Sequence, residues 1–321
     1  MPRKARPRPP RSRDSAYKRL FSHKDLVADL IRGYVDPGLA NRFDLESLER
    51  CNGSYISQDL RGRENDIVWR VKVKDEWVYV YLLLEFQSTV DHFMAVRLLG
   101  YIALLWQDLI AAKEISQDGT LPPVLPIVLY NGDRQWSAPT CLRELIASPI
   151  DLLAKYKPDL RYLFLDENRA PTADGLAVRN LVAAVFALEQ TPGLEAQRRV
   201  IAALRDWLAD RRDLKVVIGT WYAESLAPTG LPGRRRSARM SLDEIEPMMA
   251  TRILADIERQ KAESAAQGHA EGKAEGMIVA IRRLVESGVL SLSVARAQVK
   301  ALLKDHQISG KLAKEALGKL A

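Results

Sequence analysis

The chain has 321 residues, and 47% of them are hydrophobic, so it can bury a core as one large domain or as a main domain with an appendage. Two cysteines, Cys51 and Cys141, and four scattered histidines exclude a disulfide framework and a zinc site rich in Cys or His. The best apolar run, residues 77–84, has the length of a strand, and the N-terminus does not read as a secretory signal. We therefore expect a soluble protein of the reducing cytoplasm with no membrane partner.

The net charge of +7 is concentrated in the first 13 residues. This Arg- and Pro-rich segment holds six basic residues and no acid, so the remainder carries only +1. Such composition predicts a disordered tail that can neutralise DNA phosphates without reading sequence, and a merely solubilising tail is the equal alternative. The candidate DNA-binding residues are Arg3, Lys4, Arg6, Arg8, Arg11 and Arg13.

A helical segment is expected to begin at Asp14, with Tyr17 and Phe21 among the residues of its apolar face. Asp14 is by default the residue that caps this helix, and a catalytic role for it is the minority alternative. A second helix with apolar residues over 26–34 follows and ends at Pro37-Gly38.

The central stretch, residues 64–88, is predicted to be a β-hairpin that turns at Asp75-Glu76, so that Lys74 faces Trp77. This register places Asp66 opposite Glu85, with Gln87 two residues further along the same face. It rests on four apolar pairs that form one continuous core face: Ile67 with Leu84, Trp69 with Leu82, Val71 with Val80, and Val73 with Val78.

Two facing carboxylates can hold a hard cation such as Mg²⁺, because such ions are bound by carboxylate oxygens and water and do not need histidine. Asp66, Glu85, the backbone carbonyl of Phe86 and waters would complete an octahedral site. A metal there can activate water for attack on a phosphodiester, and Gln87 can orient that water. From spacing alone the signal is weak, because acid pairs on hairpins are common and can be no more than a sheet surface.

The second half of the main domain is predicted to continue a mixed α/β sheet. A long amphipathic helix over 95–109 carries Arg97 and Tyr101 one turn apart; both are solvated by default, or they look back over the carboxylate face. Strands are expected at 121–132, where Pro126 indicates an edge or a bulge, and at 162–166. Helices follow over 175–226.

The expected domain boundary is the Pro-, Gly- and Arg-rich linker 227–240, between a main domain at 14–226 and a helical C-terminal region at 241–321. In that region Gly268, Gly272 and Gly276 recur every fourth residue. Glycines at this spacing permit close approach of a partner helix, so the region is either a flexible arm or a self-association arm that makes a homo-oligomer.

Four blocks of the sequence resemble, in order, those of the Rpn family of recombination-promoting nucleases, also called YhgA-like putative transposases. The blocks are DSAYKRLFSHKDLVADLI, NDIVWRVK, YLLLEFQSTVDHFMAVRLLGYIALLW and LPPVLPIVLYNGDRQW, and the likeness covers roughly residues 14–190. It implies an α/β fold with the restriction-endonuclease-like core of the PD-(D/E)XK superfamily, a mixed central sheet flanked by helices, with a helical C-terminal extension.

The resemblance implies Asp66 and Glu85 as metal ligands and Gln87 in the place of the superfamily's lysine. Family members usually begin with His-Asp and then Phe-Lys, whereas Arg13-Asp14 and Tyr17-Lys18 stand here, so any role of that histidine is absent. Asp14, Lys18, Arg97 and Tyr101 are the auxiliary candidates of the site.

The activity implied is a Mg²⁺-dependent DNA endonuclease of low sequence specificity that promotes recombination, with Mn²⁺ or Ca²⁺ as substitute ions. It is not a transposase of the three-acid DDE type, because no such arrangement of dispersed acids is present. The alternative is a DNA-binding or scaffold protein that keeps the fold without cutting. Intact Asp66, Glu85 and Gln87 favour cutting, whereas the missing lysine and the nearly neutral body favour the scaffold.

Overall fold

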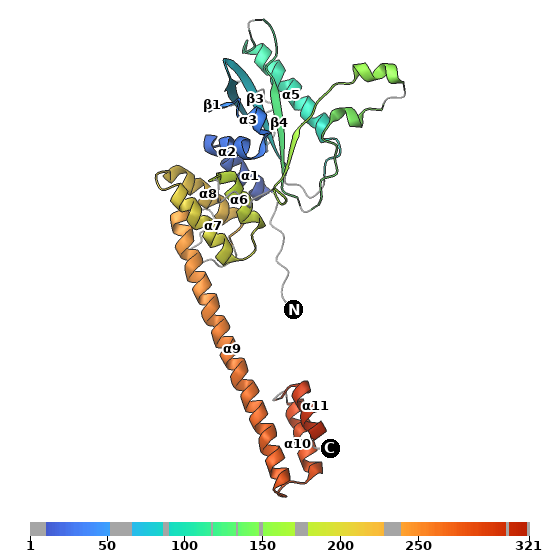
Figure 1. Ribbon diagram of the computed structural model, residues 1–321, viewed down its shortest axis with the longest axis vertical. Coiled ribbons are helices and arrows are strands. Elements are labelled where there is room, and N and C mark those ends of the chain that lie inside the picture. The colour runs from blue at the N-terminus through green and yellow to red at the C-terminus, as the bar shows by residue number, and fades with distance from the viewer. Residues whose placement is uncertain are drawn as a thin grey trace. The chain divides into compact units, whose positions relative to one another are not determined.

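The computed structural model describes residues 11–51, 66–85, 90–116, 118–132, 134–147, 150–170, 179–227, 239–305 and 308–319. The chain divides into two compact units, the first ending at Ala250 and the second beginning at Thr251. Figure 1 shows the elements of both units along the chain.

The first unit contains a five-stranded sheet in the order β1-β2-β3-β4-β5. The first three strands pair antiparallel, whereas β3, β4 and β5 are parallel, which confirms the expected mixed α/β sheet. The strands are β1 (Asp44–Arg50), β2 (Asp66–Val73), β3 (Glu76–Glu85), β4 (Val124–Tyr130) and β5 (Leu163–Asp166).

The β2–β3 hairpin has a different register from the predicted one. Val73 pairs with Glu76 across a two-residue turn, Lys74-Asp75, in which Lys74 adopts a φ of 56°. Asp66 therefore pairs with Leu83, and the predicted pairing of Asp66 with Glu85 is wrong by two residues. A shift of two keeps every side chain on its face, so the apolar alternation fits both registers and the tight turn decides between them.

The two edges of the sheet are short or irregular. The register of β1 against β2 shifts between Asp44 and Glu49. At the other edge the β4–β5 ladder begins at Ile127, so Pro126, which is in register with Tyr81 on β3, precedes the segment that β5 covers. The predicted edge strand or bulge at Pro126 is therefore wrong, since β4 is an inner strand with a regular register. Pro126 is tolerated because it lies just before the segment that β5 covers.

Helices from both ends of the first unit cover one face of the sheet and form the larger core with it. In that core the β-strand residues include Trp69, Val80 and Leu129. The helices are α1 (Arg11–Leu20), α2 (Lys24–Tyr34), α6 (Leu181–Gln190), α7 (Leu194–Trp207) and α8 (Arg212–Ser225), with the short α3 (Pro37–Ala40) before β1.

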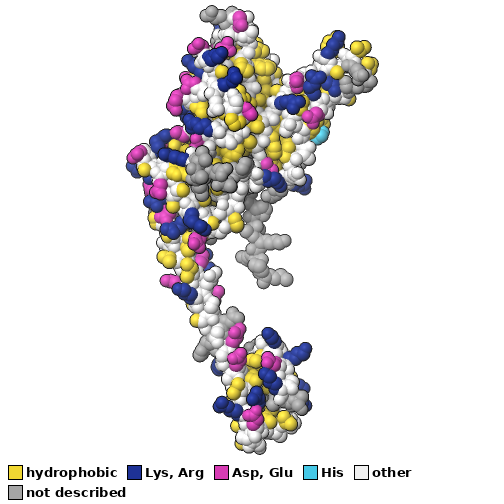
Figure 2. Space-filling model, in the orientation of Figure 1, with side chains coloured by type: hydrophobic (Ala, Val, Ile, Leu, Met, Phe, Trp, Pro, Cys, Tyr) yellow, Lys and Arg dark blue, Asp and Glu magenta, His cyan; other side chains and the backbone are white. Residues whose placement is uncertain are grey.

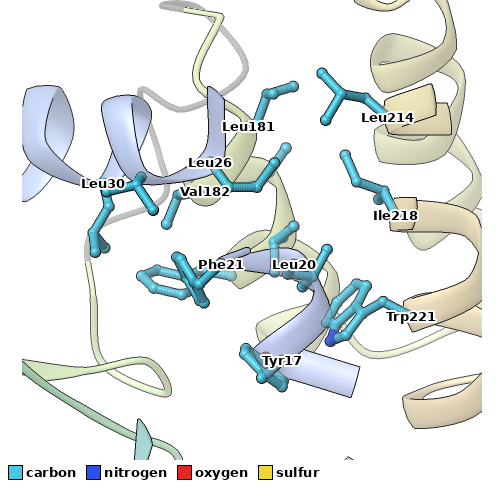
Figure 3. Packing of buried hydrophobic residues seen from close by; sticks show 14 of the residues in the cluster. Tyr17, Leu20, Phe21, Leu26, Leu30, Leu181, Val182, Leu214, Ile218 and Trp221 are labelled. Atoms are coloured by element: carbon cyan, nitrogen blue, oxygen red, sulfur yellow. The ribbon is translucent and has the colours of Figure 1, made fainter. Parts of the chain in front are cut away.

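Helix α1 is fixed by aromatic packing in this core (Figure 3). The Tyr17 ring meets the Trp221 ring of α8 edge-on, with 5.6 Å between centroids, and Trp69 of β2 donates a hydrogen bond from Nε1 to the Phe21 carbonyl at 3.0 Å. The helix begins at Arg11, so residues 11–13 are not part of a disordered tail and Asp14 is not an N-cap, contrary to the predictions. Residues 1–10 lie outside the described part of the chain.

The opposite face of the sheet is covered by α5 (Met94–Ala111), whose buried residues pack with Val68, Tyr81 and Val128. The helix confirms the predicted one at 95–109. By length and composition it could also cross a membrane, contrary to the expectation that no apolar run reaches that length. Its buried residues pack on the sheet, and 39% of the apolar stretch is buried in this way. Two short 3-10 helices, η1 (Leu142–Leu145) and η2 (Asp151–Tyr156), lie between β4 and β5.

The first unit reaches further along the chain than expected. Leu242, Ile245 and Met249, in the first turns of α9 (Leu242–Glu286), are fully buried in its core, so residues predicted to belong to the C-terminal region complete the main fold. Arg205 of α7 pairs with Asp243 at 3.0 Å and with Glu246 at 3.1 Å. The compact unit accordingly ends at Ala250 and not at 226.

The backbone of residues 240–242, at the start of α9, packs directly against Gly219 of α8. A Cβ on Gly219 would lie 2.4 Å from the Met240 carbonyl oxygen and 2.8 Å from the Leu242 nitrogen, so only glycine allows this contact. Ser241 and Glu244 form a capping box, since the Glu244 carboxylate accepts from the Ser241 N–H at 2.7 Å.

The second unit contains the rest of α9 with α10 (Leu292–Lys304) and α11 (Gly310–Lys319), which confirms its predicted helical character. Its core is small. At Gly268, Gly272 and Gly276 an added Cβ would meet nothing within 4 Å in this chain, so self-association through them stays a prediction. The core residues are Ala274, Ile281, Ala295, Val299, Ile308, Ala313 and Ala316.

We expect Gly219→Ala to destabilise the first unit by about 1–3 kcal/mol, because the new methyl group overlaps the backbone at 240–242. Gly100→Ala is the matched control, since Gly100 lies within α5 with open space around its Cβ position and should gain about 0.5–1 kcal/mol in helix propensity. Urea unfolding of both variants measures the difference; equal stabilities would contradict the close contact.

We expect a chain ending at Ala250 to keep the fold of the first unit, whereas one ending at Pro228 should lose much of its stability. The shorter chain lacks Leu242, Ile245 and Met249, and each fully buried side chain of this size contributes about 1.5–3 kcal/mol. Thermal unfolding followed by circular dichroism compares the two. If both melt like the full chain, the start of α9 is dispensable to the core.

Candidate active site

The candidate metal ligands lie near one end of the sheet, at the start of β2 and the end of β3. Asp66 is the first residue of β2, and Glu85 is the last of β3. With Leu83 opposite Asp66, Glu85 is its diagonal neighbour on the same face, at a Cα separation of about 7–8 Å. The predicted direct pair becomes a diagonal pair, a geometry in which two carboxylates can still share one ion between them.

Several predicted site residues lie outside the described part of the structure. Phe86 and Gln87 follow the last described residue of β3, and Arg3, Lys4, Arg6 and Arg8 precede α1. For Asp14, Asp66 and Glu85 the backbone positions are described and the side chains are not. Among the described side chains, no group of three or more His, Cys, Asp or Glu is arranged to hold a metal ion.

The parallel ladders align three strand ends in one row. Glu85 is in register with Tyr130 on β4, and Tyr130 is in register with Asp166 on β5. Asp166 is thus two strand spacings from Glu85, about 9.5 Å, with Tyr130 of β4 between them. Its carboxylate accepts from the Asn168 N–H at 3.1 Å and pairs with Arg169.

Tyr130 stands between these two acids and is held rigidly. It is fully buried, its ring contacts Trp136 with 5.0 Å between centroids, and its hydroxyl donates to the Arg134 carbonyl at 2.8 Å. A Cβ on Gly132 would overlap the Tyr130 ring, which explains why position 132 is a glycine. The sequence predicts this strand, but the register that pairs its last residue with Glu85 is visible only in the structure.

Tyr101 of α5 packs against this face of the sheet, and Arg97 contacts its hydroxyl. Tyr101 is 6% exposed and its ring lies 5.9 Å from that of Tyr81, four residues before Glu85, so the default interpretation of a solvated Tyr101 is wrong. Arg97 donates to the Tyr101 hydroxyl at 2.7 Å and pairs with Asp91 at 3.6 Å. Because α5 connects two parallel strands, it runs back along β3, and Arg97 is nearer than Tyr101 to the Glu85 end.

A buried acid that the sequence analysis did not select lies directly behind this row. Glu167 follows Asp166, is fully buried, and accepts hydrogen bonds from the Tyr17 hydroxyl and from Asn131 Nδ2, the latter at 2.6 Å. Its backbone carbonyl accepts from Gln190 Nε2 at 2.7 Å. The cluster joins α1, β4, β5 and α6 at the strand ends, and two of the resemblance blocks contribute to it.

The Tyr17 hydroxyl lies between two carboxylates, since it also contacts Glu189 at 3.0 Å. It carries one hydrogen and can donate to only one of them at a time. Burial and the nearby Glu167 charge raise the pKa of Tyr34 to about 12. Lys18, the residue after Tyr17 in α1, is half-buried, and its auxiliary role stays a prediction.

A charged cleft of about 550 Å³ opens elsewhere on the first unit, and its described lining comes mainly from α2, β1 and the starts of α6 and α8. The Arg211 guanidinium lowers the pKa of Asp25, to which it binds through two contacts of 2.9 Å. Burial raises the pKa of Asp29, whose carboxylate accepts from the Leu181 N–H at the start of α6 at 2.7 Å. The acids and bases of this cleft satisfy one another, which indicates a structural role.

The fold and the acid pair define a mixed α/β protein with a candidate hydrolytic site at the end of a hairpin. The family model described as "Putative transposase, YhgA-like" matches residues 11–209, and the chain belongs to this family. The resemblance noted in the sequence is thereby confirmed.

Three curated relatives from Escherichia coli show what the matching segment resembles. It is 32% identical over 141 residues to "Recombination-promoting nuclease RpnD" of strain O157:H7, covering 42% of this chain and 52% of the relative. It is 28% identical over 138 residues to "Recombination-promoting nuclease RpnA" of strain K12, covering 42% and 46%. "Putative inactive recombination-promoting nuclease-like protein YjiP" of K12 is 33% identical over 88 residues, which cover 27% of this chain and 85% of that protein.

The chain thus spans about half the length of the nucleases RpnD and RpnA that it matches. No solved structure matches this chain. The names of the relatives support a nuclease role for the family, and one relative is named a putative inactive nuclease-like protein.

We expect Tyr17→Phe to destabilise the first unit by about 1–3 kcal/mol, because it leaves a carboxylate oxygen of the fully buried Glu167 without this donor. Tyr156→Phe, at a position 73% exposed, is the control and should change stability by less than about 0.5 kcal/mol. Denaturant titration at neutral pH gives both values. Equal effects would show that the Tyr17 hydroxyl contributes nothing to the cluster.

Proposed function

We propose that the chain is a metal-dependent DNA endonuclease of low sequence specificity that promotes recombination, built on the core of the PD-(D/E)XK superfamily. The observation that supports this most is the diagonal placement of Asp66 and Glu85 on one face at the end of the β2–β3 hairpin. The chain also belongs to the YhgA-like family, and relatives that it matches are named recombination-promoting nucleases.

Asp66, Glu85 and the Phe86 carbonyl are the proposed ligands of Mg²⁺, for which Mn²⁺ or Ca²⁺ can substitute. Carboxylate and carbonyl oxygens are the donors that these hard ions take. The bound ion would supply an activated water and charge stabilisation at the phosphodiester. Gln87 would orient the water by hydrogen bonds, and Asp14, Lys18, Arg97 and Tyr101 remain auxiliary candidates.

The proposed partner is DNA in the cytoplasm, with the six cations of residues 1–13 as sequence-independent phosphate contacts. The resemblance offers no reason to propose a membrane partner. A homo-oligomer through the second unit is proposed on the spacing of its glycines alone.

A second candidate function is a DNA-binding scaffold that keeps the fold without cutting. It is favoured by the inactive relative YjiP and by glutamine at position 87, which is where the superfamily carries lysine. Glutamine cannot supply positive charge to a developing anion, so a protein with this residue depends more on the metal for catalysis.

We expect Asp66→Ala and Glu85→Ala to abolish both divalent-ion binding and cleavage. Each removes one of two charged ligands, whereas Gln87→Ala should leave ion affinity nearly intact and slow cleavage by about 10²-fold, the scale of lost positioning or proton-transfer help. The measurement is a calorimetric Mn²⁺ or Mg²⁺ titration beside a nicking time course on supercoiled plasmid.

Asp166→Asn is the matched control for this experiment. It removes an acid from the same row of strand ends but lies two strands from Glu85, so ion binding and nicking should persist. If Asp66→Ala and Glu85→Ala bind the ion and cut like the parent protein, the proposed site is only a sheet surface. If the parent binds the ion and DNA without nicking, the scaffold function is the correct one.

A further inference from the structure

The charge of the protein is divided unequally between its parts. Residues 14–250 carry 30 Lys and Arg against 33 Asp and Glu, a net charge of −3. Residues 251–321 carry 12 Lys and Arg against 8 Asp and Glu, a net charge of +4. The part that holds the proposed site is therefore weakly repelled by a polyanion, and attraction has to come from the two ends of the chain.

Many cations of the first unit are neutralised internally. Arg70 contacts Glu49 at 2.8 Å and Glu114 at 3.2 Å, and Lys215 contacts Asp243 at 3.2 Å. Further pairs of this kind are Arg19–Glu224, Lys24–Glu46, Arg198–Glu246 and Arg211–Asp25. A cation already paired with a carboxylate gains little from a phosphate, because it has to give up one partner for the other.

Helix α10 presents a different surface. Ala295 and Val299 are fully buried in the core of the second unit, and the exposed Arg296, Lys300 and Lys304 recur every fourth residue along the helix. Arg296 flanks the buried stripe, and Lys304 lies on the opposite side of the helix. Within the described part of the chain none of these three cations lies within 4 Å of a carboxylate. The exposed Lys311 and Lys314 of α11 are also outside the described ion pairs, although Lys319 and, to a smaller extent, Lys311 lower the pKa of Glu315. Figure 2 shows Lys and Arg side chains at several places on this unit.

We propose that the second unit holds duplex DNA through a basic face formed by Arg296, Lys300 and Lys304 of α10, with Lys311 and Lys314 of α11 as further contacts. The three α10 residues span about 12 Å of helix. Duplex DNA carries one phosphate charge per about 1.7 Å of its axis with both strands counted, so a span of about 12 Å contains about seven phosphates, more than the three cations need. Because these cationic side chains would contact phosphates and not base edges, the contact is independent of base sequence.

A symmetric self-association through the same face is disfavoured by its charge. A two-fold interface brings the same patch of both copies together and would place these lysines and arginines against one another. The proposal rests on the proposed function only in taking DNA as the partner, since the binding itself requires no cleavage.

The test uses the full-length chain with Arg296→Gln, Lys300→Gln and Lys304→Gln combined. The control variant combines Arg252→Gln, Arg259→Gln and Arg282→Gln, which removes the same charge from cations that are already paired with Asp256 or Glu286. Binding to a fluorescent 30-base-pair duplex is measured by anisotropy from about 50 to 300 mM salt, without divalent ions so that cleavage does not interfere.

The basic-face variant is expected to bind about tenfold or more weakly near 100 mM salt, with a log–log salt slope reduced by about 2.7, or 0.9 for each lost phosphate contact. The control variant should keep a slope within about 1 of the parent's. Lys300→Arg with Lys304→Arg should also bind like the parent, because the charge is kept. Helicity measured by circular dichroism verifies that the second unit is folded in every variant.

An unchanged slope in the basic-face variant would overturn the inference, and so would an equal loss in the control variant. If light scattering shows a changed oligomeric state while DNA binding is unaltered, the face is a self-association surface and the inference is wrong. A parent that binds DNA through this face but never nicks it would refute the nuclease and leave the inference standing. If the basic-face variant nicks DNA and binds it as tightly as the parent, the inference about this face is refuted and the nuclease proposal stands.

Discussion

The pairing of β3 with both of its neighbours determines where the candidate metal ligands Asp66 and Glu85 lie relative to the other strand ends. On one side the two-residue turn at Lys74-Asp75 sets β2, and on the other the parallel ladder sets β4. Since the side-chain period of a strand is two, a slip of one residue at the turn would exchange Asp66 for Ile67 on the site face and Trp69 for Arg70 in the core. The apolar core and the acid pair are therefore specified by the same hydrogen-bonded ladder.

The sequence predicts the strands, the long helix and the mixed sheet because each has a strong periodic signal, as in the apolar residues of 67–73 and 78–82. It also places Asp66 and Glu85 on one face of the hairpin. This result is the same for any two registers that differ by an even number of residues, because side chains alternate between the two faces. It cannot distinguish two registers that share this parity, since Asp-Glu and Lys-Asp are both weak turn dipeptides. It also cannot show that Met240 to Met249 return to the core, because a polar helix begins there and the Arg-rich segment before it resembles a linker.

The Glu167 cluster illustrates a second limit. A glutamate directly after a strand looks like a solvated loop residue, and its burial depends on Tyr17, 150 positions away in the sequence. Only the tertiary structure brings α1 against the strand ends, where Tyr17, Asn131 and Gln190 satisfy the acid and its backbone. An uncompensated charge there would be costly, so the cluster fixes the position of α1 more strictly than apolar packing alone would. This cluster lies next to Asp166, at the end of β5, and so holds α1 against the same strand ends that include Glu85.

The two edges of the sheet also bear on how the protein behaves in a crowded cell. An open edge with a long regular row of free backbone groups is a template for strand addition by another chain. Here β1 has an irregular register and the charged sequence DLESLER, and β5 is only four residues long. Pro126 lacks a backbone N–H just before the segment that β5 covers. Both edges are therefore poor templates, and aggregation by sheet extension is disfavoured even though the inner strands are strongly apolar.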